Sequence, residues 1–269
     1  STDIDEILSD AETDAVVIAT RHNAHARQVC AALKAGKHVF VEKPLALNRE
    51  QLEEIVSVYE AANAKERTIL TVGFNRRFAP QVIRMKELLD TVAEPKSFII
   101  TVNSGAIPPD HWTQDAGVGG GRIIGEACHF IDLWRHRAGY PITGVQATMI
   151  GGGAAVPVHA DKISFTLRFA DGSFGTVHYL ANGNKSFPKE RIEVFCAGRI
   201  LQLDNFRKLT GWGWPGFRKM NLWRQDKGNE ACARAFVDAV RRREVDPIPF
   251  EELIEVARVS FEVVEAATL

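Results

Sequence analysis

A lysine follows an apolar run at a point where a parallel sheet would present it to a ligand. The run covers residues 38–41, and Glu42, Lys43 and Pro44 come directly after it. Open α/β sheets bind their ligands at the carboxyl ends of their strands, and a proline restricts the backbone of the residue before it. We therefore predict that Lys43 donates a proton or a hydrogen bond to a substrate oxygen. The alternative is an exposed lysine at the start of a loop.

A second group with chemical potential lies in a segment that we expect to be helical, residues 122–137. Glu126, His129 and Asp132 are three residues apart and would share one helix face. A histidine flanked by carboxylates is predicted to be a general acid/base with a pKa near neutrality. The same three residues could instead ligate a metal, or form a polar stripe under a loop.

Polar residues also follow the two other apolar runs of the N-terminal third. Thr20, His22 and His25 come after the first run, and Arg76 comes after the third. Because the carboxyl ends of parallel strands share one edge of a sheet, we expect these side chains to converge with Lys43 on a cofactor. Helix capping is the alternative for each of them.

The elements that position these residues alternate in the first third of the chain. Apolar runs predict strands, and periodic segments ended by Gly36 or begun by Asn48 and Pro80 predict helices, with Thr2-Asp3 capping the first. The expected strands are 15–20, 38–41 and 69–74, and the expected helices are 4–8, 24–35, 48–64 and 79–90. This alternation predicts a parallel, Rossmann-type sheet in a domain of residues 1–92.

The pattern changes after Pro95. Alternating segments and hairpin turns at 170–173 and 197–198 predict a second domain, residues 93–269, with an open, mostly antiparallel sheet. Two C-terminal helices, 229–242 and 250–266, are expected to return toward the first domain. The fold class is therefore α/β, with an incomplete Rossmann-type sheet followed by an α+β domain for substrate binding and oligomerisation.

The composition excludes several classes of protein. The 269 residues carry a formal net charge of −1, which gives no electrostatic reason to bind nucleic acid or a membrane. No apolar run is long enough to span a membrane, and the N-terminus has no signal-peptide pattern. The four cysteines are scattered without a C-x-x-C pair, which argues against a zinc site and favours a reducing, cytoplasmic location.

These motifs together resemble the Gfo/Idh/MocA family of NAD(P)-dependent oxidoreductases. The residues that carry the resemblance are Thr20 to His25, Glu42-Lys43-Pro44, the segment 73–78 and the segment 119–132. The resemblance implies that Lys43 is the catalytic lysine and that His129 is the acid/base on the substrate carbinol. It also implies that Thr20 and Glu42 lie beside the nicotinamide of NAD or NADP.

The sequence departs from the family pattern at three places. Gly125 stands where the family usually carries an aspartate, and Arg21-His22 replaces a Pro-Asn pair. The first strand and its glycine-rich turn are missing, so the chain resembles a truncated enzyme or the C-terminal module of a two-module oxidoreductase. We expect the sheet edge exposed in this way, or the open sheet face, to mediate homo-oligomerisation.

The leading functional hypothesis is an oxidoreductase that moves a hydride between NAD(P) and a sugar, nucleotide sugar or cyclitol. Asp132 would orient His129 or bind a substrate hydroxyl, and Glu126 would assist. One alternative is a sugar-binding or regulatory module without catalysis, and another is a metal-dependent lyase or isomerase. The predicted substrate-binding residues, besides His129, are Asn103, Trp112, Asn182 and Lys185.

Overall fold

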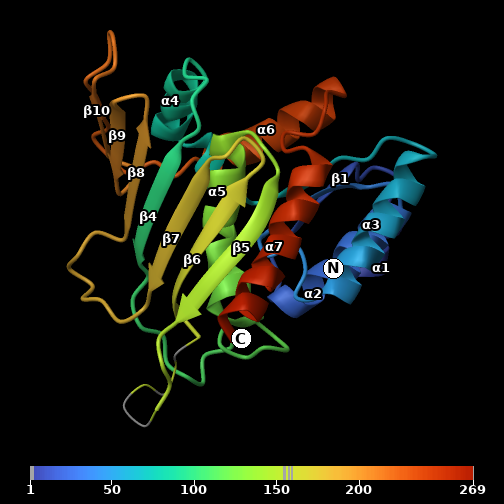
Figure 1. Ribbon diagram of the computed structural model, residues 1–269. Coiled ribbons are helices and arrows are strands. Elements are labelled where there is room, and N and C mark those ends of the chain that lie inside the picture. The colour runs from blue at the N-terminus through green and yellow to red at the C-terminus, as the bar shows by residue number, and fades with distance from the viewer. Residues whose placement is uncertain (1–2, 154–155, 157, 159, 269) are drawn as a thin grey trace.

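The structure is a computed structural model that describes residues 3–153, 156, 158 and 160–268. Within these residues a small sheet and a large sheet lie on opposite sides of two helices, α5 (Cys128–Ala138) and α7 (Phe250–Thr268), as Figure 1 shows. The small sheet is parallel and the large one is mostly antiparallel, so the predicted fold class is confirmed.

The small sheet is built as the apolar runs predict. Its strands lie in the order β1 (Ala15–Ile18), β2 (His38–Val41) and β3 (Leu70–Val72), with α1 (Ile4–Ser9), α2 (His22–Lys34) and α3 (Arg49–Asn63) between or before them. Val41 lies beside Ile18 on one side and Val72 on the other. The three strands therefore end at the same level, and the residues after them meet at one edge.

One detail of this region differs from the sequence prediction, and the cap of the first helix agrees with it. Helix α2 begins at His22, two residues earlier than expected, without a side-chain cap from Arg21. This start places His22 in the first turn of the helix rather than in a free loop. Asp3 caps α1 by accepting a hydrogen bond from the Asp5 amide at 2.9 Å, whereas Thr2 lies outside the described residues.

The large sheet follows a short 3₁₀-helix, η1 (Asn75–Phe78), and helix α4 (Pro80–Leu89). Its strand order is β11-β10-β9-β8-β4-β7-β6-β5, and of these neighbours β4 and β7 pair in parallel. The strands are β4 (Ser97–Asn103), β5 (Ile142–Met149), β6 (Lys162–Phe169), β7 (Phe174–Leu180), β8 (Glu190–Cys196), β9 (Arg199–Asp204), β10 (Lys208–Trp212) and β11 (Lys219–Asn221). The sequence analysis did not predict strands at β5, β10 or β11.

One face of the large sheet packs on α5 and the other is open. Phe98, Ile100 and Val102 of β4 are fully buried, and the ring of Phe98 lies 4.8 Å from that of Trp134 in α5. The intervening residues Ile99 and Thr101 are only partly buried. This alternation is the one expected of a sheet with a single packed face.

The predicted helix 122–137 is interrupted in the structure. Residues Ile123–Ala127 form a π-helical turn, η2, before α5 begins, and Gly139 ends α5 with a φ of 76°. π-turns inside helices recur at functional sites because they displace side chains from the regular α-helical positions. The segment with Gly125 and Glu126 is therefore the irregular part of this helix.

Both C-terminal helices contact the small sheet. The ring of Phe236 in α6 (Asn229–Arg242) lies 5.7 Å from that of Phe40 in β2, and Arg49 of α3 pairs with Glu265 of α7 at 2.8 Å. Figure 1 shows α7 running alongside β5 and past α3.

No helix in the described part of the chain is long and apolar enough to cross a membrane. The four cysteines are buried and unpaired.

Candidate active site between the two sheets

Lys43 connects the small sheet to the π-turn. It follows β2, its side chain is half-buried, and its Nζ donates a hydrogen bond to the carbonyl oxygen of Gly125 at 2.6 Å. The two residues are 82 positions apart in the chain. The lysine predicted from the strand-end motif therefore lies at the junction of the two sheets.

His25 holds the loops on either side of Lys43. It is fully buried, with Nδ1 2.8 Å from the carbonyl oxygen of Pro44 and Nε2 3.1 Å from that of Thr20. The ring thus ties the end of β1 to the loop after β2. Both nitrogens face the backbone and the side chain has no exposed surface, so these contacts do not support the predicted contact of His25 with a cofactor.

His22 lies on the other side of Lys43, against the glycine-rich segment. Its Nδ1 is 2.8 Å from the carbonyl oxygen of Gly119, and its ring meets the edge of Trp112 at 4.7 Å. Gly125 packs on the same ring, since a Cβ built there would lie 3.1 Å from Cε1 of His22. His22 and Trp112 were predicted for cofactor and substrate respectively, and the structure brings them together.

His129 lies at the start of α5 and is 6% exposed. Its Nδ1 is enclosed and has no hydrogen-bond partner among the described residues, whereas Nε2 is not enclosed in this way. Burial, followed by the charges of Arg76 and Lys43, lowers the pKa of His129 well below its ordinary value. The prediction of a near-neutral pKa is wrong, because cations and not carboxylates surround the ring.

Glu126 is saturated with donors and does not face His129. It accepts hydrogen bonds from Arg122, from the Tyr179 hydroxyl at 2.6 Å and from Lys189 at 2.6 Å. Burial raises the pKa of Glu126, but the charges of Lys189 and Arg122 outweigh burial and lower it to about 2. A carboxylate held in this way anchors the π-turn on β7, and the catalytic role predicted for Glu126 stays a prediction.

Asp132 is also used for a structural contact. It is fully buried and accepts two hydrogen bonds from Arg77, which reaches on to Glu252 of α7 at 2.9 Å. No hydrogen bond joins Asp132 to His129 within the described residues. These contacts do not support the predicted roles of Asp132, to orient His129 or to bind a substrate hydroxyl, and those roles stay predictions. The sequence analysis missed Arg77, although the Arg76-Arg77 pair at a strand end was the available signal.

Arg76 is not free for a cofactor either. It is 5% exposed, pairs with Glu190 of β8 at 2.8 Å and lies 5.0 Å from the centre of the Phe130 ring. Lys227 donates to the same Glu190 at 2.8 Å. These contacts do not support the predicted cofactor binding, which stays a prediction; in this structure Arg76 places a positive charge near His129.

Thr20 and Glu42 remain accessible at the carboxyl ends of β1 and β2. Both are exposed, and Thr20 donates from Oγ1 to Gln28 at 2.7 Å. A Cβ at Gly73, after β3, would lie 3.1 Å from Oε2 of Glu42, so a larger residue there would displace that carboxylate slightly.

The described residues do not include a glycine-rich turn that could bind a pyrophosphate. Gly211, Gly213 and Gly216 have the G-x-G-x-x-G spacing, but they lie in and after β10, in a hairpin that leads to β11. That motif binds pyrophosphate only where a strand leads into a helix N-terminus. The three glycines therefore do not form a dinucleotide cradle.

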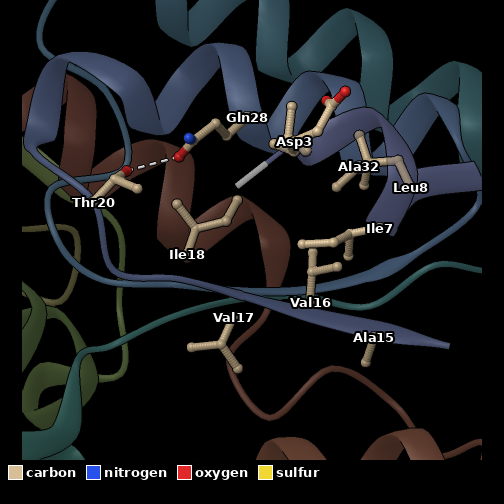
Figure 2. A pocket seen from close by; sticks show the side chains of 11 residues that line it. Asp3, Ile7, Leu8, Ala15, Val16, Val17, Ile18, Thr20, Gln28 and Ala32 are labelled. Carbon is tan, nitrogen blue, oxygen red and sulfur yellow. Dashed lines mark hydrogen bonds between the residues drawn. The ribbon is translucent and has the colours of Figure 1, made fainter. Parts of the chain in front are cut away.

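The free edge of β1 borders an apolar hollow of about 380 Å³. Figure 2 shows Ile7, Leu8, Val16 and Ile18 lining it, with the Thr20–Gln28 hydrogen bond at one end. Val17 points to the opposite side of the strand and is 70% exposed. The hollow has the lining of a packing site for an apolar chain segment rather than of a phosphate site.

The remaining predicted substrate residues lie elsewhere. Asn103 donates to the carbonyl oxygens of Asn184 and Phe187 at 2.7 and 3.2 Å, and so holds a loop. Asn182 and Lys185 line a hollow of about 740 Å³ beside β6. None of the three shares a contact with Lys43 or His129, so the structure does not bring them into this site.

The described residues contain no group of three or more His, Cys, Asp or Glu side chains that could hold a metal ion. Glu126 and Asp132 are turned toward different cations, Lys189 and Arg77. The metal-dependent alternative therefore has no ligand set in the described part of the chain.

Comparison with known proteins identifies two matching family models and related dehydrogenases. Residues 1–74 match a family described as an oxidoreductase family with an NAD-binding Rossmann fold, and residues 82–201 match the GFO/IDH/MocA C-terminal domain. Myo-inositol 2-dehydrogenase of Thermotoga maritima is 30% identical over 210 residues, which are 76% of this chain and 60% of that enzyme. The chain thus spans about three fifths of the length of such relatives.

Solved structures share the whole fold. A probable dehydrogenase from Thermotoga maritima is 25% identical with a TM-score of 0.80, and the match covers 100% of this chain and 82% of that one. Levoglucosan dehydrogenase, solved with NADH and levoglucosan, is 23% identical with a TM-score of 0.83 and coverages of 100% and 81%.

Proposed function

Because the chain belongs to the Gfo/Idh/MocA family of oxidoreductases, we propose that the protein oxidises a hydroxyl group of a cyclitol or sugar with NAD(P) as hydride acceptor. The observation that supports this most is the pairing of Lys43 with the π-turn before His129. It connects a strand-end lysine to the segment that leads into α5, the helix that carries the buried imidazole of His129. The whole protein's activity is proposed, since the chain spans only part of its relatives.

Lys43 and His129 would share the handling of the hydroxyl proton. A bound nicotinamide supplies the acceptor for the hydride that leaves the carbinol carbon. His129 is neutral and its Nε2 is not enclosed, so it can accept the hydroxyl proton as the C–H bond breaks. Lys43 donates a hydrogen bond to the same oxygen and stabilises the negative charge that develops there.

Thr20 and Glu42 would contact the nicotinamide end of the cofactor. Both are exposed at the strand ends next to Lys43. The described residues provide no seat for the pyrophosphate, so we expect its binding to require further residues. The choice between NAD and NADP also depends on those residues.

The substrate class rests on the names of the relatives. Myo-inositol, inositol and levoglucosan dehydrogenases all act on ring compounds that carry several hydroxyl groups. A nucleotide sugar is a narrower possibility, which the basic residues Lys185 and Lys189 at the domain surface would favour.

A second proposal concerns domains and assembly. We divide the chain into a cofactor domain, residues 1–92, and a substrate and oligomerisation domain, residues 93–269. Homo-oligomers would form through the open face of the large sheet or through the region of β1.

The test is an assay of the full-length protein with NAD⁺ and NADP⁺ and a panel of cyclitols and sugars. Formation of NADH or NADPH with one class of polyol is the expected result. Binding of a polyol without any reduction of either cofactor would contradict the proposal and favour a sugar-binding or regulatory module. Energy transfer from the tryptophans to added NADH reports cofactor binding separately.

A further inference from the structure

A second imidazole lies beside Lys43, and the proposed reaction leaves it without a task. His22 is 8% exposed and belongs to the first turn of α2. Its Nδ1 lies 2.8 Å from the carbonyl oxygen of Gly119, and its ring contacts the edge of Trp112. The ring therefore has a single fixed orientation between the two sheets.

The contact with Gly119 determines which nitrogen carries the proton. A carbonyl oxygen only accepts hydrogen bonds, so Nδ1 must be the N–H donor. Burial lowers the pKa of His22 to about 4, and the nearby charge of Lys43 acts in the same direction. The ring is therefore neutral at neutral pH, and Nε2 carries a lone pair.

This lone pair has no donor in the described part of the chain. Nδ1 makes the hydrogen bond of His22, and Nε2 does not belong to the enclosed polar atoms that lack a partner. It is thus an open acceptor on an otherwise packed ring.

Gly125 lies between the His22 ring and the lysine. A Cβ at position 125 would lie 3.1 Å from Cε1 of His22, the ring atom between the two nitrogens, and 3.4 Å from Nδ1. The carbonyl oxygen of the same glycine accepts the hydrogen bond from Lys43 at 2.6 Å. A donor, Lys43, and an acceptor, His22, therefore flank one residue that has no side chain to separate them.

We propose that His22 is a substrate-binding residue whose Nε2 accepts a hydrogen bond from the hydroxyl next to the one bound by Lys43. The inference rests on the proposed function and narrows its substrate to polyols with adjacent hydroxyl groups. One hydroxyl presents its oxygen to Lys43, and its neighbour presents its hydrogen to His22. A compound with an isolated hydroxyl satisfies only one of the two groups.

Two substitutions distinguish substrate binding by His22 from a purely structural contact between α2 and Gly119. The amide nitrogen of asparagine overlays Nδ1 of histidine, so His22→Asn keeps the donor to Gly119 and removes the acceptor. Glutamine reaches the position of Nε2, so His22→Gln restores an acceptor there. His178→Asn is the matched control, because His178 faces the open side of the large sheet and is bonded to Ser164 at 2.8 Å.

The experiment measures the affinity of the full-length, NAD⁺-saturated protein for myo-inositol and for glucose by calorimetry. Loss of one hydrogen bond to a buried group predicts roughly tenfold weaker binding in His22→Asn. His22→Gln should recover part of the affinity, and His178→Asn should leave it unchanged. Wild-type affinity in His22→Asn would overturn the inference while the proposed function stood.

A second readout is independent of turnover. In ¹⁵N NMR spectra the Nε2 signal of His22 should shift when the polyol is added, because a lone pair that accepts a hydrogen bond changes its resonance. An unchanged signal at saturating polyol would refute the contact. If no polyol binds to the wild-type protein at all, the proposed function fails together with the inference.

Discussion

The Nζ atom of Lys43 donates a hydrogen bond to the carbonyl oxygen of Gly125 across 82 residues of sequence, at 2.6 Å. The bond connects the end of a strand in the small sheet to the π-turn that precedes α5. The position of the lysine amino group is therefore set by a segment of the other sheet's domain. Substitutions in the π-turn should therefore move the amino group of Lys43 and, through it, alter the catalytic activity.

Replacement of Lys43 by methionine tests its role in proton handling. General acid/base assistance contributes roughly 10²- to 10⁴-fold to turnover, so Lys43→Met should lower kcat of the full-length enzyme by that order. Lys34→Met is the control, since Lys34 is exposed on α2 and its nearest carboxylate, Glu54, is 3.9 Å away. Full activity in Lys43→Met would refute the assignment.

Gly125→Ala tests the packing between the π-turn and His22. The added methyl group would meet Cε1 of His22 at 3.1 Å and the Gly119 carbonyl at 3.2 Å, and His22 is held by Gly119 and Trp112. We expect kcat/KM to fall about tenfold or more, because a small displacement of reacting groups is costly. An alanine gains about 0.5–1 kcal/mol over glycine in helical backbone, which should keep the loss of stability small.

Two controls accompany this substitution. Gly151→Ala adds a methyl group where no atom lies within 4 Å and should be silent. In the double variant with His22→Ala the contact of the methyl group with the ring disappears and only that with the Gly119 carbonyl remains, so the two effects should be less than additive. Strict additivity of the two losses would contradict the packing argument.

The pair Arg77–Asp132 should stabilise the fold rather than take part in catalysis. Both side chains are almost fully buried, and Asp132→Asn leaves the Arg77 guanidinium with Glu252 as its remaining carboxylate partner. The substitution should therefore cost about 1–3 kcal/mol of unfolding free energy through the weakened charge-assisted hydrogen bonds. Arg234→Met, which breaks an exposed pair with Glu230, should cost no more than about 0.5 kcal/mol. Urea titrations measure both; a stable Asp132→Asn variant with lost turnover would instead restore the catalytic role.

The sequence was sufficient to predict the elements whose pattern is local. Apolar runs and caps located β1, β2 and α3, and the strand-end motif located Lys43, because strand ends of a parallel sheet coincide. The proximity of the residues that follow the three strands was predictable for the same reason.

The hydrogen-bond and ion-pair partners of the charged side chains were not predictable, because they come from segments that are distant in the sequence. Asp132 looked like a neighbour of His129 on one helix face, yet Arg77, 55 residues earlier, pairs with it. Glu126 likewise bonds to Tyr179 and Lys189 of the large sheet. Spacing along a helix shows which side chains share a face but not which charges reach that face from other elements.

Acidification should destabilise the protein through its histidines. Burial lowers the pKa values of His22, His38, His129 and His136, that of His22 from 6.5 to about 4. Between these two values the unfolded chain binds more protons than the folded one, so unfolding free energy falls as pH drops below about 6.5 and is unaffected above it. Each such histidine contributes up to about 1.4 kcal/mol per pH unit in its window.

Denaturant titrations at pH 7.5, 6.5 and 5.5 check this dependence. His22→Phe removes one of the titrating groups and should reduce the slope below pH 6.5. The carboxylate Glu126, with its pKa lowered to about 2, loses its contribution only below pH 4.5 and so does not interfere. Stability that is constant from pH 7.5 to 5.5 would show that these rings are not held neutral.

Val17 should lie in a self-association surface of this 269-residue chain. It pairs in register with Phe40 of β2, which α6 covers through Phe236, yet Val17 itself is 70% exposed at the sheet edge. An apolar edge strand favours pairing with another chain. Val17→Lys should shift the sedimentation profile toward monomer, whereas Val245→Lys, at a position that is 74% exposed between α6 and α7, should not. A wild-type chain that sediments as a monomer at high concentration would rule out association at this edge.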